Sequence, residues 1–162
     1  MIKILKLNLF IVFFVYQTFA FSKTTDEIDF NPKYISNYLS AIISENNHNS
    51  QDSLKYFNSS KVLISKHEGY LKKYVVNLTA NGKVQKSINT IKQNIKKKNS
   101  KFFEANLLLL IDNFKKKKFK ENIELFNEFE GYKSYGNYEY IIYEVLKNYN
   151  DLFLTREVNL NR

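Results

Sequence analysis

The stretch Ser53-Leu-Lys-Tyr-Phe57-Asn-Ser-Ser60 decides the fold of this 162-residue chain, because the spacing of its key residues recurs. A small residue stands four positions before a large apolar one, and the third residue of the pattern, here Ser60, follows three positions after the apolar one. The same spacing returns 34 residues downstream and again 35 residues after that, as Ser87, Ile91 and Asn94 and then as Asn122, Phe126 and Phe129. The small side chain allows a partner helix to approach closely, while the large one fills the gap between units. A period of this length indicates a stacked array of helical hairpins.

The rest of the chain also has the apolar spacing of helices. Only four glycines and one proline occur, which is too few turn residues for a protein of many strands. We therefore predict an all-α protein. The expected helices begin at Pro32, Ser50, Tyr70, Val84, Phe102 and Phe119, the second reaching Leu63, and a seventh occupies residues 137–156.

Local signals mark several helix ends. Asn31-Pro32 is a typical start, with Asn as the cap and Pro in the first turn, and Ser50 is the expected cap of the second helix. Asn81-Gly82 is a typical stop. A turn residue stands five positions before each copy of the recurring spacing, at His48, Gly82 and Lys117. These signals predict three pairs of helices joined by short turns.

The period, the two-helix unit and the recurring spacing resemble tetratricopeptide repeats (TPR), of the degenerate kind found in exported bacterial proteins. The resemblance covers residues 34–130, roughly three units. Ala41, Gly82 and Phe119 fall on the small first-helix residue, the turn glycine and the aromatic that starts the second helix. Val75 and Leu110 replace the small residue in the other units. A generic helical bundle or another α-solenoid is the alternative.

The resemblance implies a protein-binding scaffold or adaptor, with a concave groove lined by the first helix of each unit. Carried over position by position, the groove residues are Tyr38, Ile42, Glu45, Lys72, Val76, Thr79, Leu107, Ile111 and Phe114. An apolar groove edged by one acid and one lysine suits a peptide helix or an extended segment. Alternatively, Ile42, Leu107 and Ile111 fill a tight superhelix or contact the helix of residues 137–156.

The first 22 residues have the three parts of a secretory signal peptide. Met1 to Lys6 is a basic head, Leu7 to Tyr16 is a short apolar run, and a polar exit ends at the expected cleavage site after Ser22. An uncleaved signal anchor is the alternative. We expect export to the periplasm or cell envelope. The expected organisation is a signal peptide (1–22), a flexible lead (23–31), the repeat domain (32–130), a linker (131–136), the C-terminal helix (137–156) and a tail (157–162).

A formal charge of +9, or +7 without Lys3 and Lys6, raises a second functional possibility. The lysine runs 96–98 and 115–118, the latter beside Phe114 and Phe119, would suit a basic module that binds an anionic membrane surface or nucleic acid. Lysines at helix ends also suit the helix dipole, and AT-rich codons favour lysine without any ligand. An exported protein meets little nucleic acid, so lipid or an acidic partner is the stronger electrostatic target.

Catalysis has little support in the sequence. His48 and His67 are the two histidines, each in an expected turn, and no known catalytic, nucleotide-binding or metal-binding motif occurs. Glu128 and Glu130 stand beside lysine-rich turns, as solvated surface residues do. We therefore expect no enzyme activity, no cofactor and no small-molecule substrate.

The C-terminal helix predicts a partner. Its apolar residues, from Tyr140 to Leu154, spread over more than one face. Such a helix has to be covered by a further repeat, by the groove or by another chain. If this helix is the first half of a repeat unit whose second half is missing, self-association through it is expected.

Overall fold

A computed structural model of the chain describes residues 31–96, 100–129 and 137–155. The expected signal peptide, residues 23–30 of the lead, the linker and the tail lie outside the described residues, as do Lys97, Lys98 and Glu130. Every helix described below belongs to one compact unit, which begins at Pro32.

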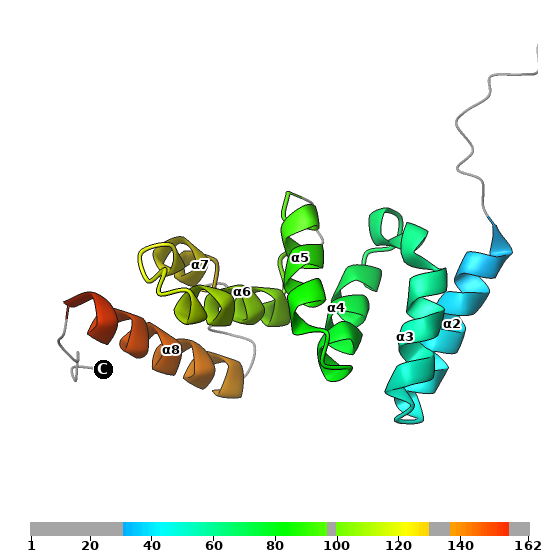
Figure 1. The fold of residues 1–162 in the computed structure, drawn as a ribbon, viewed down its shortest axis with the longest axis horizontal. Helices are drawn as coiled ribbons and strands as arrows, with labels where there is room; N and C mark the ends of the chain where they lie inside the picture. Colours follow the sequence, from blue (N-terminus) through cyan, green and yellow to red (C-terminus); the bar gives the residue numbers. More distant parts are fainter. Residues whose placement is uncertain (1–30, 97–99, 130–136, 156–162) are drawn as a thin grey trace, which may run out of the picture. The chain divides into compact units, whose positions relative to one another are not determined.

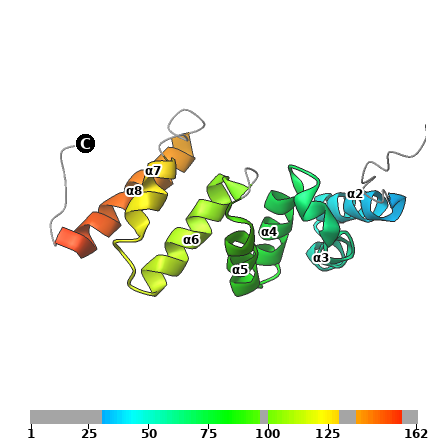
Figure 2. The ribbon, with the colours of Figure 1, turned by 90° about the horizontal axis from the view of Figure 1, so that it is seen from above.

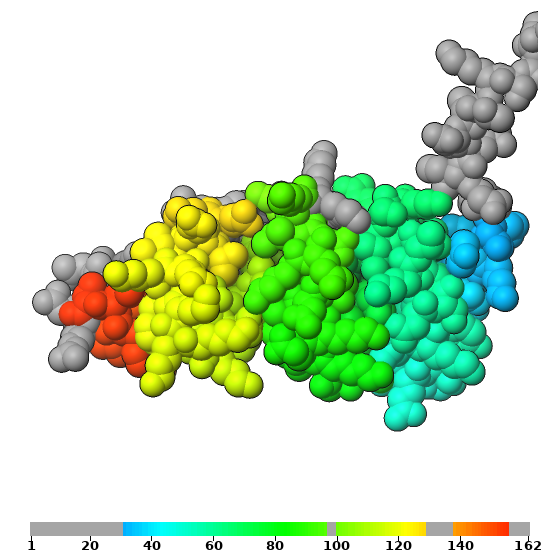
Figure 3. Space-filling view, turned by 45° about the horizontal axis from the view of Figure 1, so that its top comes forward, coloured from blue at the N-terminus to red at the C-terminus, as the bar shows by residue number. Residues whose placement is uncertain are grey.

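Seven α-helices and one 3-10 helix account for most of the described residues, and no strand occurs among them, so the all-α prediction is confirmed. Figure 1 labels the helices α2 to α8. Their bounds are α2 Pro32–Asn46, α3 Ser50–Ser59, η1 Lys61–Ser65, α4 Tyr70–Ala80, α5 Val84–Asn94, α6 Phe103–Lys115, α7 Asn122–Phe129 and α8 Asn137–Thr155. From α2 to α8 each α-helix packs on the next, and α4 also contacts α6 (Figures 1 and 2). The space-filling view shows the same succession of segments (Figure 3).

The turns within the three helix pairs share one backbone geometry. His48, Gly82 and Lys117 have φ values of 58°, 70° and 59°, in the left-handed region. In each turn the next residue donates its N–H to the carbonyl five residues earlier: Asn49 to Ser44 at 2.9 Å, Lys83 to Leu78 at 2.8 Å and Lys118 to Asn113 at 2.9 Å. This is the Schellman arrangement that ends helices. The three predicted turn positions are confirmed.

The second predicted helix is interrupted, contrary to the prediction that it reaches Leu63. Helix α3 ends at Ser59, and two side-chain hydroxyls bind carbonyls of its last turn. Tyr70 Oη donates to the Phe57 carbonyl, and Ser60 Oγ donates to the Tyr56 carbonyl at 2.9 Å. The chain then forms η1, which buries Leu63 against the core.

Two further boundaries differ from the prediction. The cap of α3 is Asn49 instead of Ser50, since Asn49 Oδ1 accepts the backbone N–H of Asp52 at 3.1 Å. Helix α7 begins at Asn122, and Phe119 lies in the preceding turn. There its ring packs 4.8 Å from the ring of Phe153 on α8. The Phe119 side chain therefore links this turn to α8.

The core consists of two clusters. The first joins helices α2 to α6, and its fully buried members include Phe57, Tyr70, Leu71, Tyr74 and Leu78. The second joins α6, α7 and α8 through Phe103, Leu110, Phe126 and Tyr143. Leu125 packs against both clusters, so the two are continuous through α7.

The recurring small residues make recurring bonds. Ser53 Oγ donates to the Ala41 carbonyl at 2.9 Å, and Ser87 Oγ donates to the Val75 carbonyl at 2.8 Å. All four residues are fully buried. Each bond spans twelve residues and joins the two helices of a pair. The hydroxyl is small enough for close helix contact and still satisfies a buried polar group.

Helix α8 packs on α7 in the same way as α4 packs on α3. The first match between the two helix pairs is an aromatic contact. Tyr70 on α4 meets Phe57 on α3 edge to face, with ring centroids 5.5 Å apart and an interplanar angle of 84°. Tyr143 on α8 meets Phe126 on α7 in the same way, at 5.8 Å and 78°. Phe57 and Phe126 both occupy the large apolar position of the recurring spacing.

A buried asparagine makes the second match between these two helix pairs. Asn77 Nδ2 on α4 donates to Ser53 Oγ on α3 at 2.8 Å, and Asn122 Nδ2 on α7 donates to Asn150 Oδ1 on α8 at 3.0 Å. Asn77 and Asn150 are both buried. The step from Tyr70 to Tyr143 and the step from Asn77 to Asn150 are each 73 residues. Helix α8 is therefore the structural counterpart of α4.

Candidate functional site

The nine predicted groove residues lie on the first helix of each pair, three on α2, three on α4 and three on α6. Within each helix their i, i+4 and i+7 spacing places them on one face. Tyr38 is withdrawn from the surface, with only 7% of its area exposed. Its ring packs against His67 at 4.7 Å and Tyr70 at 5.3 Å. Burial, with a smaller effect of the negative charge of Glu45, raises the pKa of Tyr38.

The two charged groove residues form ion pairs between neighbouring first helices. Glu45 Oε2 on α2 lies 3.3 Å from Lys73 Nζ on α4, and Lys72 Nζ on α4 lies 2.9 Å from Glu104 Oε1 on α6. These side chains are partly exposed, so each pair contributes no more than about 1 kcal/mol. Their charges are balanced within the chain, which leaves the face without a strong charge of its own.

Thr79 is committed to its own helix pair. Its hydroxyl donates to the Val75 carbonyl at 3.0 Å and lies 3.0 Å from Ser87 Oγ on α5. The side chain therefore faces α5, and its hydroxyl has internal partners. Sequence spacing alone could not reveal this. It places Thr79 on a face of its helix, but it does not show whether the hydroxyl is exposed or binds a carbonyl of its own helix and a side chain of the next.

Five predicted groove residues remain accessible, and all are apolar. We call them the apolar strip: Ile42, Val76, Leu107, Ile111 and Phe114. Ile42 packs partly against the first core cluster, and Leu107 and Phe114 pack partly against the second. Ile111 is 49% exposed. The structure thus divides the predicted set into one core residue, three residues with internal partners and an apolar strip on three successive first helices.

Helix α8 has an exposed apolar face, and the sequence alone did not predict which side of the helix it would occupy. Tyr138, Ile141, Val145, Tyr149 and Phe153 are all exposed. Their spacing of three or four residues places them on one side of the helix. We call this the α8 stripe. The helical spacing was visible in the sequence, but the side of α8 that packs on α7 was not.

A separate pocket of about 610 Å³ lies among α5, α6 and α7. Its apolar lining includes Ile91, Leu109 and Leu125, and none of the nine groove residues lines it. Five lysines and three glutamates surround it: Lys92, Lys101, Lys116, Lys118, Lys120, Glu121, Glu124 and Glu128. Its size falls in the range of small-molecule sites.

Most lysines of this pocket already have acidic partners. Lys92 and Lys116 each lie 2.8 Å from the carboxylate of Asp112, whose side chain is only 3% exposed. Hydrogen bonds from Lys116 and then Lys92 hold the pKa of Asp112 below its usual value. Lys101 pairs with Glu128 at 3.0 Å and Lys118 with Glu121 at 2.8 Å. Because these pairs neutralise most of the lysine charge, the pocket does not offer an anion a concentrated positive charge.

Other candidate chemistry is sparse in the described part of the chain. His48 is an exposed turn residue, and His67 packs against Tyr38. No group of three or more His, Asp or Glu side chains within the described ranges could hold a metal ion. Among the described helices, none is both long enough and apolar enough to cross a membrane.

The candidate site is thus the face formed by the apolar strip, flanked by paired charges, with the α8 stripe as a second accessible apolar surface. No protein-family model, curated protein or solved structure matches the chain.

Proposed function

We propose that this chain is a non-catalytic protein-binding scaffold or adaptor of the bacterial cell envelope, built as a solenoid of three TPR-like hairpins plus a C-terminal helix. Its first helices would hold a peptide or a partner helix. The shared geometry of the turns at His48, Gly82 and Lys117 supports the repeat. The matching Ser53–Ala41 and Ser87–Val75 bonds support equivalent packing in two of the hairpins.

The observation that carries the proposal is the apolar strip. An accessible isoleucine such as Ile111 between two partly buried apolar residues, Leu107 and Phe114, is a surface that gains from being covered. The neighbouring charges of Glu45 and Lys72 are already paired, so they do not oppose an apolar ligand. An apolar face with few competing charges suits an amphipathic helix or an apolar extended segment.

The proposed location follows from the sequence of residues 1–22, a basic head followed by a short apolar run and a polar exit. Export would bring the scaffold to the periplasm or cell envelope, where its partner would be a protein or peptide. Export can be tested by expressing the full chain in a bacterium, separating the processed and unprocessed forms by size and sequencing their N-termini. A new N-terminus at Lys23 supports export, and a retained Met1 in the soluble cell interior contradicts it.

A basic module for anionic lipid or nucleic acid is the second candidate, and specific lysines favour it. Lys96, Lys115, Lys117 and Lys120 are exposed and form no ion pair within the described part of the chain. Binding through such lysines would fall steeply with salt. Binding through the apolar strip would persist at salt concentrations that screen surface charges.

One pair of variants separates the two candidates. Ile111 on α6 and Ile123 on α7 are 49% and 51% exposed, so Ile111→Glu and Ile123→Glu introduce the same charge at matched exposure. A peptide selected on the full chain from a displayed library should bind Ile111→Glu roughly tenfold or more weakly, and Ile123→Glu within about twofold of wild type. Circular dichroism checks that both variants stay helical. Equal binding by both variants, with full loss in moderate salt, would reject the scaffold and favour the lysines.

A further inference from the structure

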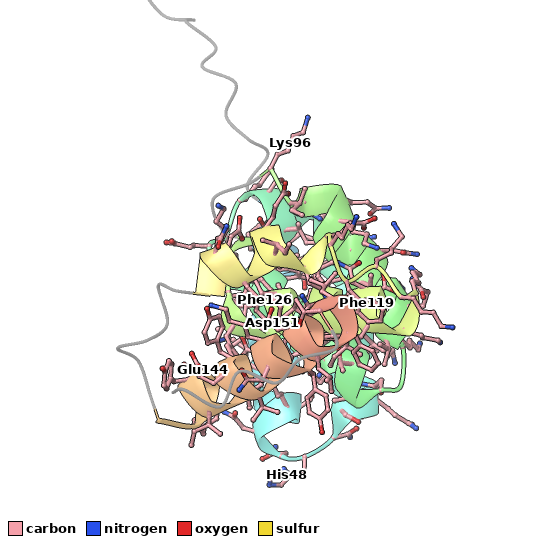
Figure 4. The ribbon with its side chains drawn as sticks, turned by 90° about the vertical axis from the view of Figure 1, so that its left-hand side faces the viewer. His48, Lys96, Phe119, Phe126, Glu144 and Asp151 are labelled. Carbon is pink, nitrogen blue, oxygen red and sulfur yellow. The ribbon has the colours of Figure 1, made fainter. Side chains whose placement is uncertain are left out.

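The apolar strip and the α8 stripe meet at three aromatic rings, which we call the aromatic junction. Phe119, in the turn before α7, has its ring centroid 6.1 Å from that of Phe114 on α6 and 4.8 Å from that of Phe153 on α8. The rings of Phe119 and Phe153 are stacked, with an interplanar angle of 9°. Figure 4 views the molecule from the α8 side and labels Phe119 beside this helix. The two apolar surfaces are therefore continuous through Phe119.

The match between α8 and α4 supports the same continuity. The residues that stand 73 positions after the three predicted groove residues of α4 are Val145, Tyr149 and Leu152. Val145 and Tyr149 are exposed members of the α8 stripe, and Leu152 is partly buried. The stripe thus occupies on α8 the positions that the predicted groove residues occupy on α4. All three residues are apolar or aromatic, so α8 adds apolar surface to the face that the first helices form.

Two exposed lysines stand beside the aromatic junction. Lys115 follows Ile111 by four residues, and helical spacing places both on the same side of α6. Lys117 occupies the left-handed turn between α6 and α7. Both lysines, which we call the junction lysines, are exposed and form no ion pair within the described part of the chain. The acids that stand closest to them in the sequence, Asp112 and Glu121, are already paired with other lysines.

The acidic residues of α8 are placed away from the junction. Glu139 lies in the first turn of the helix, at the end opposite to Phe153. Asp151 and Glu144 precede Phe153 by two and nine residues, and a rotation of roughly 100° per residue turns both to the other side of the helix. Glu144 also interacts within the chain already. Within α8, no acid is therefore placed to offset the junction lysines.

We infer that the partner of the scaffold is an acidic amphipathic helix, whose apolar side covers Ile111 and Phe153 while its aspartates or glutamates meet the junction lysines. This inference rests on the proposed scaffold function and specifies the chemistry of its partner. Charge complementarity of this kind selects the partner and its orientation. The projecting side chains of a helix reach the partly buried rings of Phe114 and Phe119, which the flat surface of a bilayer does not.

The experiment uses the purified full chain and two labelled helical peptides with the same leucine face, one carrying glutamates on its polar side and the other lysines. At moderate salt the leucine–glutamate peptide should bind roughly tenfold more tightly. Lys115→Gln/Lys117→Gln should weaken its binding about tenfold. Lys83→Gln/Lys86→Gln removes the same charge from two other exposed lysines and should change the binding less than about twofold. This control accounts for the general attraction of a chain with a formal charge of +9.

A second pair of variants tests whether α8 contributes to the binding face. Phe153 on α8 and Ile43 on α2 are 57% and 60% exposed, and Ile43 is not one of the predicted groove residues. Phe153→Ser should weaken binding of the leucine–glutamate peptide about tenfold, while Ile43→Ser should change it less than about twofold. Circular dichroism checks that both variants stay helical.

Several results would overturn the inference, and they separate it from the proposed function. A preference for the leucine–lysine peptide, or equal effects of the two lysine double variants, contradicts an acidic partner at the junction. If Phe153→Ser leaves binding unchanged but Ile111→Ser weakens it, the apolar strip survives and only the extension to α8 falls. If neither variant weakens binding, both proposals fall. Binding to phosphatidylglycerol vesicles that Phe153→Ser abolishes, without any peptide binding, would assign the junction to a membrane surface instead.

Discussion

Ser87 Oγ donates a 2.8 Å hydrogen bond to the carbonyl of Val75, and the bond repeats, one period along, the bond that Ser53 makes to Ala41. The hydroxyls are fully buried between two helices, so a larger side chain would separate the helices and a methyl group would leave a carbonyl with one partner fewer. The recurring small residue therefore plays the same part in two helix pairs of this chain. Its energetic contribution can be measured.

Removing these hydroxyls should destabilise the fold by different amounts. Ser87→Ala loses its bond to Val75 and a contact with Thr79, and it should cost about 1 kcal/mol of unfolding free energy. Ser53→Ala also leaves the buried Asn77 amide without its acceptor, and it should cost about 2 kcal/mol. Urea titration followed by circular dichroism measures both. Ser59→Ala, at an exposed position, is the control and should stay within about 0.5 kcal/mol.

The three left-handed turns predict opposite effects of glycine and alanine. His48 and Lys117 hold φ values of 58° and 59° despite their side chains, so His48→Gly and Lys117→Gly should each stabilise the fold by about 0.5–1 kcal/mol. Gly82 has a φ of 70°, and a Cβ there would meet no atom within 4 Å. Gly82→Ala should therefore destabilise by about 1 kcal/mol through backbone strain alone. The same urea titrations decide the point, and a loss of stability in both glycine variants would contradict the turn geometry.

The Asp112 carboxylate should make stability depend on acid pH. Hydrogen bonds from Lys116 and Lys92 lower its pKa in the folded chain, so its contribution is present above the unfolded-state pKa of about 3.9 and is lost as pH falls through the folded value. Asp112→Asn should cost about 2 kcal/mol at pH 7 and progressively less as pH falls below 4. Thermal or urea unfolding from pH 7 to pH 2 tests this. A penalty that stays constant over that range would show that the charge of Asp112 is not the cause.

The break between α3 and η1 should depend on the Tyr70 hydroxyl. Tyr70→Phe removes its bonds to the Phe57 carbonyl and to Ser60 while keeping the buried ring, and it should cost about 1–2 kcal/mol. Tyr56→Phe is the matched control, since Tyr56 is only partly buried, and it should stay within about 0.5 kcal/mol. Amide hydrogen exchange of Lys61 and Val62 should also change in Tyr70→Phe alone. Equal stability of the two variants would exclude the hydroxyl as the cause of the break.

Much of the helical arrangement could be predicted from the sequence, because its signals are local. The turns at His48, Gly82 and Lys117 follow from a period visible in the spacing of small and apolar residues. The break after Ser59 could not be predicted, since the hydroxyl that binds the Phe57 carbonyl there comes from Tyr70, thirteen residues away. Local propensity cannot register such a contact.

The candidate site was predicted less completely, for a related reason. A repeat register places Tyr38 and Thr79 on the same side of their helices as Ile111, but it does not say which of them other side chains cover. Tyr38 is buried against aromatic rings, and Thr79 binds Ser87 on the neighbouring helix.

The apolar strip can be tested directly by locating a bound peptide on the surface of the chain. The chain contains no cysteine, so Ile111→Cys and Ile123→Cys each allow one environment-sensitive fluorophore at a single, half-exposed position. We predict that a peptide selected on the full chain shifts the emission of the label at position 111 to shorter wavelength and leaves the label at position 123 unchanged. A shift only at position 123, or no shift at position 111 at saturating peptide, would contradict the claim that the apolar strip is the binding face.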